Sequence, residues 1–183
     1  MRAVEISLIL LVLLASAVSG SDRARVEETA KFKLNSHSFS DQAEIPKKYT
    51  GDGDDVSPEL HWSDQPPGAK SFALIVDDPD APAGTWVHWV LFDLPGEAHD
   101  LPEGAGKSAP LPGGAQQGTN DFKKVIYGGP CPPPGKPHRY FFRLYALDSK
   151  LSLKASATKA EVERAMRGRV LGQAELTGRY RRQ

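Results

Sequence analysis

The stretch Phe72-Ala73-Leu74-Ile75-Val76 is a continuous apolar run that ends at Asp77. A short run with no polar face is typical of a strand that is buried on both sides. Along the rest of the chain, 15 prolines and 17 glycines separate further short apolar runs, which favours β structure. Two such runs, Trp86 to Leu94 and Arg139 to Leu147, are predicted as the next strands.

The alternation of side chains along these two strands predicts which residues share a face. In the first, one face carries Trp86, His88, Val90 and Phe92, and the other carries Val87, Trp89, Leu91 and Asp93. In the second, one face carries His138, Tyr140, Phe142 and Leu144, and the other carries Arg139, Phe141, Arg143 and Tyr145. Each strand therefore places a histidine two residues from an aromatic side chain.

A helix is predicted late in the chain. Thr158 and Glu161 have the spacing of a capping box, and Val162, Ala165 and Met166 follow at helical spacing. We expect Gly168 to interrupt this helix, Val170-Leu171 to resume it, and Ala174 to Tyr180 to form a last strand. The predicted fold class is mainly β, built from antiparallel sheets with a short helical segment packed beside them near the C-terminus.

The N-terminus has the pattern of a secretory signal. Ile6 to Val18 is almost wholly apolar, and small residues follow it. We therefore expect residues 1–20 to be a signal peptide, residues 21–31 a flexible lead-in, and residues 32–183 a single domain. Export to the periplasm or the medium follows from this interpretation, and an uncleaved anchor is the alternative.

Charge and cysteine content narrow the class of protein. The formal net charge is +0, so no field of one sign points to nucleic acid or to an anionic membrane surface. Cys131 is the only cysteine. An internal disulfide and a structural zinc site of the multi-cysteine type are therefore excluded, and we expect no cofactor.

The segment Asp78-Pro79-Asp80-Ala81-Pro82 directly follows the buried strand. Asp78 can accept a proton from a histidine and fix its tautomer, and Asp80 can close the turn through its own backbone. We expect Arg139 to form a bidentate pair with Asp80, because it points away from His138. The alternative is that the whole segment is only a rigid turn.

His88 and His138 are expected to face one cavity. Stiff loops at Pro95 to Gln117 and Gly128 to Pro137 would hold its rim. Histidine N–H groups and the Tyr140 hydroxyl suit a small anion with an apolar attachment. Two alternatives remain open: a metal held by Asp78, His88 and His138, and a nucleophilic pair of Cys131 with His138. The acidic segment Asp52 to Asp55 lacks the spacing of an EF-hand and is interpreted as a polar turn.

Together these motifs resemble the phosphatidylethanolamine-binding protein family, in its bacterial Raf-kinase-inhibitor-like branch. The resemblance rests on Asp78-Pro79-Asp80-Ala81-Pro82, Trp86-x-His88 and the Gly129-Pro130 that leads to His138-Arg139-Tyr140, and it extends over residues 32–180. It implies two antiparallel sheets with an anion pocket at one end. The residues that it implies as pocket lining are Asp78, Pro82, Trp86, His88, His138 and Tyr140. Asp80, Arg139, Gly129 and Pro130 would support them.

Three functions are compatible with this resemblance. The first is an exported, non-enzymatic protein that binds phosphate or a phosphoethanolamine-type head group and acts as an inhibitor or scaffold. The second is a module that binds a protein partner, such as a protease or a kinase, through its proline-rich loops. The third is a phosphoester hydrolase in which Asp78 and His88 form an acid–base pair. We expect no stable insertion into a membrane and no bound metal.

Overall fold

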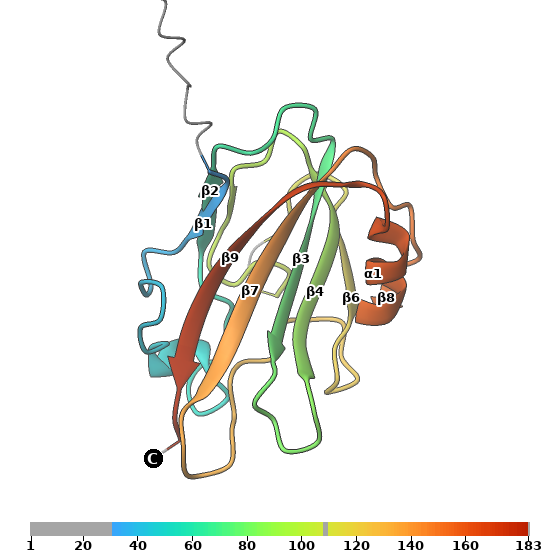
Figure 1. The fold of residues 1–183 in the computed structure, drawn as a ribbon. Coiled ribbons are helices and arrows are strands. Elements are labelled where there is room, and N and C mark those ends of the chain that lie inside the picture. The colour runs from blue at the N-terminus through green and yellow to red at the C-terminus, as the bar shows by residue number, and fades with distance from the viewer. Residues whose placement is uncertain (1–30, 108–109, 183) are drawn as a thin grey trace, which may run out of the picture.

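Two β-sheets of different size make up the fold (Figure 1). The structure is a computed structural model that describes residues 31–107 and 110–182. The larger sheet has the strand order β8-β6-β4-β3-β7-β9, and the smaller sheet has the order β1-β2-β5. The strands are β1 (Lys33–Asn35), β2 (Leu60–Ser63), β3 (Ser71–Asp78), β4 (Trp86–Pro95), β5 (Asp100–Leu101), β6 (Gln116–Thr119), β7 (His138–Leu147), β8 (Ser156–Thr158) and β9 (Val170–Tyr180). The predicted fold class is confirmed, with one parallel pair, β6–β8, in an otherwise antiparallel arrangement.

Strand β3 lies at the centre of the larger sheet, between β4 and β7. All eight of its residues are buried, as the continuous apolar run predicted. Leu74 and Val76 pack toward the smaller sheet, and Ala73 and Ile75 pack toward the helix. A strand covered on both faces needs apolar side chains at every position, which explains why its sequence does not alternate.

Strand β7 follows the predicted alternation. Tyr140, Phe142 and Leu144 belong to the core between the two sheets, whereas Tyr145 packs against the opposite cluster. On that opposite face the guanidinium of Arg143 lies 4.5 Å from the ring centroid of Phe141. The strict period of two therefore places His138 and Tyr140 on the inner face at the strand's start.

Strand β4 departs from the predicted alternation. Val90 and Phe92 were expected to share a face with His88, but they pack with Val87 on the helix side, while Trp89 lies in the core between the sheets. The pairing of β4 with β3 shifts register between Val76 and Asp77. A β-bulge adds one residue to a strand and reverses the faces beyond it, and the composition of β4 gives no sign of that extra residue.

The core between the sheets contains large side chains from both layers, including Leu60 and Trp62 of β2 and Phe72 of β3. The rings of Trp62 and Phe72 meet edge to face at 5.4 Å. A second, smaller cluster lies between the larger sheet and the helix. Because both faces of the larger sheet are covered, its central strands form a rigid base for the loops at their ends.

The predicted helix is present as α1 (Lys159–Met166), with a short 3-10 turn, η1 (Lys47–Tyr49), far earlier in the chain. Both hydrogen bonds of the capping box between Thr158 and Glu161 are formed. The prediction that Val170-Leu171 resumes the helix is wrong, because β9 already begins at Val170. Gly168 has a φ of 75°, a left-handed conformation that ends the helix and turns the chain toward β9.

Two further expectations have mixed outcomes. The segment Pro95 to Gln117 was expected to be a loop, but it contains β5 and the start of β6. The segment Gly128 to Pro137 has no strand or helix, as expected.

The signal peptide expected at residues 1–20, and the lead-in apart from Lys31, lie outside the described residues. Among the residues that the structure describes, no helix is long and apolar enough to span a membrane.

Candidate functional site

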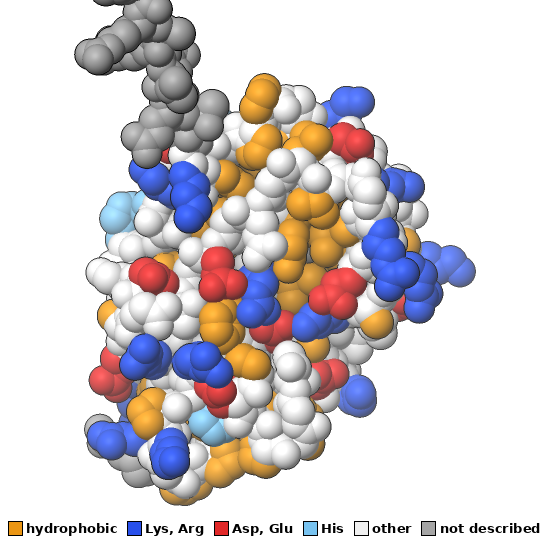
Figure 2. Space-filling model, viewed as in Figure 1, with side chains coloured by type: hydrophobic (Ala, Val, Ile, Leu, Met, Phe, Trp, Pro, Cys, Tyr) orange, Lys and Arg blue, Asp and Glu red, His pale blue; other side chains and the backbone are white. Residues whose placement is uncertain are grey.

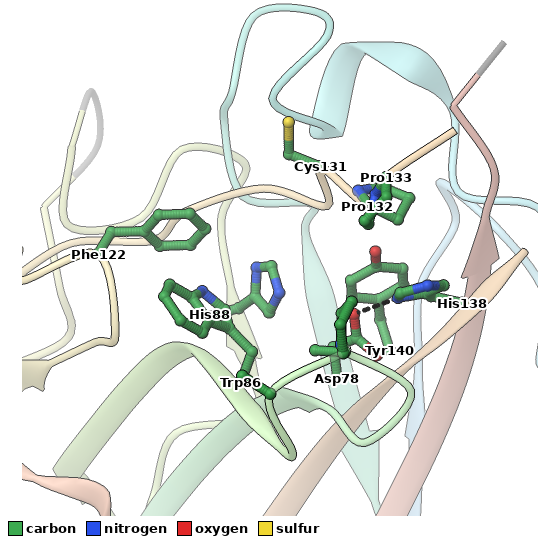
Figure 3. Close-up of a pocket in the computed structure, with 12 residues that line it drawn as sticks. Asp78, Trp86, His88, Phe122, Cys131, Pro132, Pro133, His138 and Tyr140 are labelled. Atoms are coloured by element: carbon green, nitrogen blue, oxygen red, sulfur yellow. Dashed lines mark hydrogen bonds and ion pairs between the residues drawn. The ribbon is translucent and has the colours of Figure 1, made fainter. Parts of the chain in front are cut away.

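The end of β3 and the starts of β4 and β7 meet at one edge of the larger sheet, and the loops beyond them enclose a pocket. The pocket has a volume of about 270 Å³. Figure 3 shows its labelled side chains arranged around one space. The lining residues are Asp78, Ala81, Pro82, Ala83, Trp86, His88, Phe122, Cys131, Pro132, Pro133, His138 and Tyr140. All six residues expected to line a pocket are therefore brought together, although Asp78 and His138, for example, lie 60 positions apart in the sequence.

Asp78 and His138 form a hydrogen-bonded couple at the pocket floor. Oδ2 of Asp78 lies 2.7 Å from Nδ1 of His138, and the two side chains are 4% and 13% exposed (Figure 3). Oδ1 of Asp78 accepts a hydrogen bond from the Asp80 N–H at 2.8 Å. Asp78, not Asp80 as expected, therefore closes this turn through its side chain. The carboxylate makes Nδ1 of His138 the protonated nitrogen, which leaves Nε2 for a ligand.

His88 is held in a different way. Its Nδ1 lies 2.7 Å from the Gly128 carbonyl oxygen, which can only accept, so Nδ1 carries the proton. Burial lowers the pKa of His88, against the opposing effect of that carbonyl. The ring is therefore neutral at pH 7, and its Nε2 is an acceptor. The acid–base pair of Asp78 with His88 that the hydrolase hypothesis needs is not formed, because Asp78 bonds to His138 instead.

Tyr140 places a hydroxyl between the two histidines. The side chain is 1% exposed, and its ring meets the His88 ring edge to face at 5.2 Å. The Oη atom is buried and lies near the Asp78 carboxylate, but the contact is weak, and no described group is in hydrogen-bond geometry with the oxygen. Burial, assisted by the charge of Asp78, raises the pKa of Tyr140. The hydroxyl is thus protonated at neutral pH, and it lacks a well-placed acceptor within the described part of the chain.

Aromatic side chains form one wall of the pocket. The ring of Phe122 meets those of Trp86 and His88, in each case edge to face at 5.4 Å. Phe122 was not predicted as a pocket residue, because it lies in a loop after β6 and carries no periodic signal. Cys131 is at the rim and exposed, and Figure 3 shows its sulfur pointing away from His138. No contact of the Cys131 thiol with that imidazole supports a nucleophilic pair.

The predicted pair of Asp80 with Arg139 is present and bidentate. Nε of Arg139 lies 2.9 Å from Oδ2 of Asp80, and Nη2 lies 2.7 Å from Oδ1. The Arg139 N–H donates a third hydrogen bond, at 3.0 Å, to Oδ2. These bonds hold the pKa of Asp80 at about 2 despite partial desolvation. The pair joins the loop after β3 to the start of β7, and so fixes Asp78 against His138.

Gly129 and Pro130 support the opposite wall. The Gly129 N–H donates to Asp55 at 2.6 Å, and the Pro130 carbonyl accepts from the Gly51 N–H at 2.9 Å. A Cβ at position 129 would lie 2.7 Å from the carbonyl oxygen of Tyr49, so only glycine fits there. Asp55 belongs to the acidic segment interpreted as a polar turn. The turn therefore anchors the loop whose Gly128 carbonyl orients His88.

The lining carries one carboxylate, two imidazoles and one free phenol, and none of the described lining residues is Lys or Arg. When His138 is protonated, its charge balances that of Asp78. The site then offers N–H and O–H donors in a pocket with no net charge. Such a site can bind a monoanion or a zwitterion through hydrogen bonds, because it contains no excess positive charge to neutralise a dianion.

Comparison with known proteins agrees with this architecture. The family model described as phosphatidylethanolamine-binding protein matches residues 35–181. A protein named UPF0098 protein from Methanothermobacter thermautotrophicus is 52% identical over 149 residues, which cover 81% of this chain and 98% of that protein. A UPF0098 protein from Aquifex aeolicus is 50% identical over 155 residues, covering 84% of this chain and 90% of its own length.

Two solved structures are also similar. Escherichia coli YbcL, described as a new member of the mammalian family, matches with a TM-score of 0.79 and 36% identity, over 84% of this chain and all of that one. A phosphatidylethanolamine-binding protein homologue from Chlamydia trachomatis matches with a TM-score of 0.77 and 40% identity, over 84% of this chain and 99% of that one. The similarity thus extends over nearly all the residues that form the two sheets and the pocket.

Proposed function

The chain belongs to the phosphatidylethanolamine-binding protein family, and we propose that it is an exported protein that binds a small phosphate-containing anion in the pocket of Asp78, His88, His138 and Tyr140. Phosphate and a phosphoethanolamine-type head group are the ligands that this site favours. Export is inferred from the pattern of residues 1–20 alone. Binding would serve an inhibitory or scaffolding role rather than turnover.

The observation that carries the proposal is the buried Tyr140 hydroxyl, which has no acceptor in hydrogen-bond geometry among residues 31–107 and 110–182. A buried donor that lacks a partner costs about 1–3 kcal/mol, and a ligand oxygen in the pocket would remove that cost. Nε2 of His138 supplies a second donor when the imidazole is protonated, and the hydrogen bond to Asp78 holds the ring in place. Two donors on the inner face of one strand, β7, can therefore converge on one acceptor group.

His88 adds a requirement on the ligand. Its neutral ring presents Nε2 as an acceptor, since Nδ1 is committed to the Gly128 carbonyl. A phosphate monoanion can donate its own P–O–H there, and an ethanolamine ammonium can donate N–H. A fully ionised dianion has no proton to give. We therefore expect the site to prefer singly charged or zwitterionic phosphate species.

The size of the pocket limits the ligand further. About 270 Å³ corresponds to roughly nine water volumes at about 30 Å³ each. That space holds a phosphate group with a short substituent, and a longer chain would extend past Pro132 and Pro133 at the mouth. The wall of Trp86 and Phe122 suits the methylene groups of such a substituent.

Calorimetric titration tests the proposal with phosphate and with phosphoethanolamine as separate ligands. We expect saturable binding to one site, and a loss of at least about tenfold in affinity for His138→Gln. His99→Gln is the matched control, because that histidine is exposed and lies on another loop. Affinity unchanged in His138→Gln would contradict the proposal. Tighter binding of phosphoethanolamine than of phosphate would identify the head group as the ligand.

A protein-binding role is the second candidate. The loop beside the pocket mouth is exposed from Pro133 to Pro137, and its prolines limit the entropy that it would lose on contact with a partner. Inhibition of serine proteases by the purified chain, unaffected by His138→Gln and lost when residues 133–137 are replaced by glycine and serine, would favour this function over anion binding.

A further inference from the structure

Three side chains that are not part of the pocket converge on the smaller sheet. His37 follows β1, Glu59 precedes β2, and His61 lies within β2. One potential ligand atom from each lies within 4.8 Å of the other two. In Figure 1, β1 and β2 are at the upper left, whereas the loop from β3 to β4 that borders the pocket is at the bottom. Figure 2 shows histidine at the surface on the same side as these strands.

The Glu59 carboxylate is fixed by its surroundings. Its Oε1 accepts hydrogen bonds from the Ser36 hydroxyl at 3.0 Å, from the Ser38 N–H at 3.2 Å and from the His37 N–H. Although partial burial acts against it, the bonds from the His37 N–H and the Ser36 hydroxyl, together with the nearby His61 imidazole, lower the pKa of Glu59, so the group is ionised at neutral pH. With Oε1 occupied by three donors, Oε2 is the oxygen available to a ligand.

The two imidazoles face this carboxylate. Nδ1 of His61 lies 3.5 Å from Oε2 of Glu59, and Nδ1 of His37 lies 3.4 Å from Oε1. The rings are stacked, with centroids 4.4 Å apart and planes inclined by 25°. Nδ1 of His61 is buried and has no hydrogen-bond partner among the described residues. At 3.5 Å its contact with the Glu59 carboxylate is long, so this buried nitrogen still lacks a close partner.

The separation of 3.5 Å between Nδ1 of His61 and Oε2 of Glu59 fits a shared metal ion better than a direct bond. Zinc binds histidine nitrogen and carboxylate oxygen at about 2.0–2.2 Å, so neighbouring ligand atoms of a tetrahedral site lie roughly 3.3–3.5 Å apart. A charge-assisted N–H···O bond is shorter, at about 2.7–2.9 Å. Both rings can direct a lone pair to one ion only if one of them tilts. His37 is free to do so, because its side chain is 82% exposed.

We propose that His37, Glu59 and His61 form a binding site for a first-row divalent cation of the zinc class. Two imidazoles and one carboxylate leave a further position for water, and nitrogen-rich sets of this kind select zinc or copper over magnesium and calcium. The hydrogen bonds to Oε1 would orient the carboxylate from outside the coordination sphere. The ion would join the segment after β1 to β2, at a distance from the anion pocket.

The pocket itself offers a weaker set. Within the described residues, Asp78, His88 and His138 do not bring ligand atoms as close together as the cluster on the smaller sheet does. Nδ1 of His88 and Nδ1 of His138 are already committed to Gly128 and Asp78. A cation is therefore expected at His37 and His61 and not at the site inferred from the sequence.

The test uses the untagged chain, stripped with a chelator and titrated with zinc chloride by calorimetry in a buffer free of phosphate. We expect one zinc ion per chain, and a fall in affinity of at least about tenfold for Glu59→Gln and for His61→Ala. Glu59→Gln keeps an acceptor for the three donors, so its fold should survive. His99→Ala, an exposed histidine outside the cluster, is expected to leave the affinity unchanged.

Cobalt supplies a second readout. Paramagnetic Co²⁺ is expected to broaden the NMR ring signals of His37 and His61 and to leave those of His88 and His138, in the distant pocket, sharp. The proposal is overturned if the wild-type chain shows no one-site binding at a large excess of zinc. It is equally overturned if the double variant His37→Ala/His61→Ala binds zinc as the wild type does, or if His88→Ala removes the binding instead.

Discussion

Replacing Tyr140 by phenylalanine is expected to stabilise the free protein and to weaken ligand binding at the same time. The substitution removes one oxygen from a side chain that is 1% exposed and leaves the ring, which packs against His88, in place. The oxygen makes no hydrogen bond to a described group. Deleting it therefore leaves no partner unsatisfied, in contrast to most removals of a buried hydroxyl.

The magnitudes follow from the cost of a buried unpaired polar group. That cost is about 1–3 kcal/mol, and part of it is recovered in Tyr140→Phe. We expect a gain of about 1 kcal/mol, which raises Tm by about 2–4 °C in a domain of this size. Binding of an anionic oxygen would lose one charge-assisted hydrogen bond, worth about 1.5 kcal/mol or more. Affinity for phosphate should then fall by about tenfold.

Tyr127 supplies the matched control. It is equally buried, but its hydroxyl donates to the Tyr49 carbonyl at 2.8 Å. Tyr127→Phe leaves that carbonyl unpaired, so we expect a loss of about 1–2 kcal/mol in the free energy of unfolding. Urea unfolding and calorimetric titration of both variants measure the two effects. If Tyr140→Phe destabilises the protein as Tyr127→Phe does, and binds phosphate as the wild type does, the hydroxyl is paired in the folded state and the reasoning is refuted.

Three further changes test other parts of the structure. The pKa of His88 is lowered in the folded protein, so as the pH falls this imidazole takes up a proton at a higher pH in the unfolded chain than in the folded chain. The neutral imidazole therefore contributes to stability above a pH of about 6.5, and that contribution is lost as the pH falls below this value. In His88→Asn, the decrease in urea midpoint from pH 7 to pH 5.5 should therefore become smaller. Asp77→Asn should cost about 3 kcal/mol by urea unfolding, since it leaves two partly buried cations without their shared carboxylate, whereas exposed Asp54→Asn should be neutral. Gly129→Ala should cost about 2 kcal/mol and weaken phosphate binding, because its Cβ would meet backbone at 2.7 Å; Gly113→Ala, with open space around it, should do neither.

Much of the fold could be predicted from local pattern. The uninterrupted apolar run at β3 and the alternation along β7 reflect burial on two faces and on one face, and those patterns are visible in any window of the sequence. The capping box at Thr158 was predictable for the same reason, because its two partners lie three residues apart. The bulge in β4 was not predictable from the sequence, since it depends on the register between β4 and β3. The start of β9 at Val170 is likewise fixed by pairing with Leu147.

Some features of the candidate site could likewise be predicted from local sequence, and others could not. The pair of Asp80 with Arg139, and the facing of His88 and His138, could be predicted because these residues lie next to the predicted strand ends. The full set of six lining residues followed from the family resemblance. The hydrogen-bond partner of each imidazole could not be predicted from the sequence. Which histidine Asp78 meets, and that Gly128 orients His88, depends on how two distant loops pack. Phe122 was missed because a single aromatic residue in a loop gives no pattern.

The most direct measurement is an NMR titration of the histidine ring nitrogens with phosphate and then with phosphoethanolamine. The ring signals distinguish the protonated nitrogen from the free one in each imidazole. We expect Nδ1 to carry the proton in His88 before ligand is added. The Nε2 signals of His88 and His138 should then move together with one dissociation constant, while the signals of His99 stay fixed. If neither Nε2 signal moves at millimolar ligand, the pocket residues have a structural role and the protein does not bind small phosphate anions there.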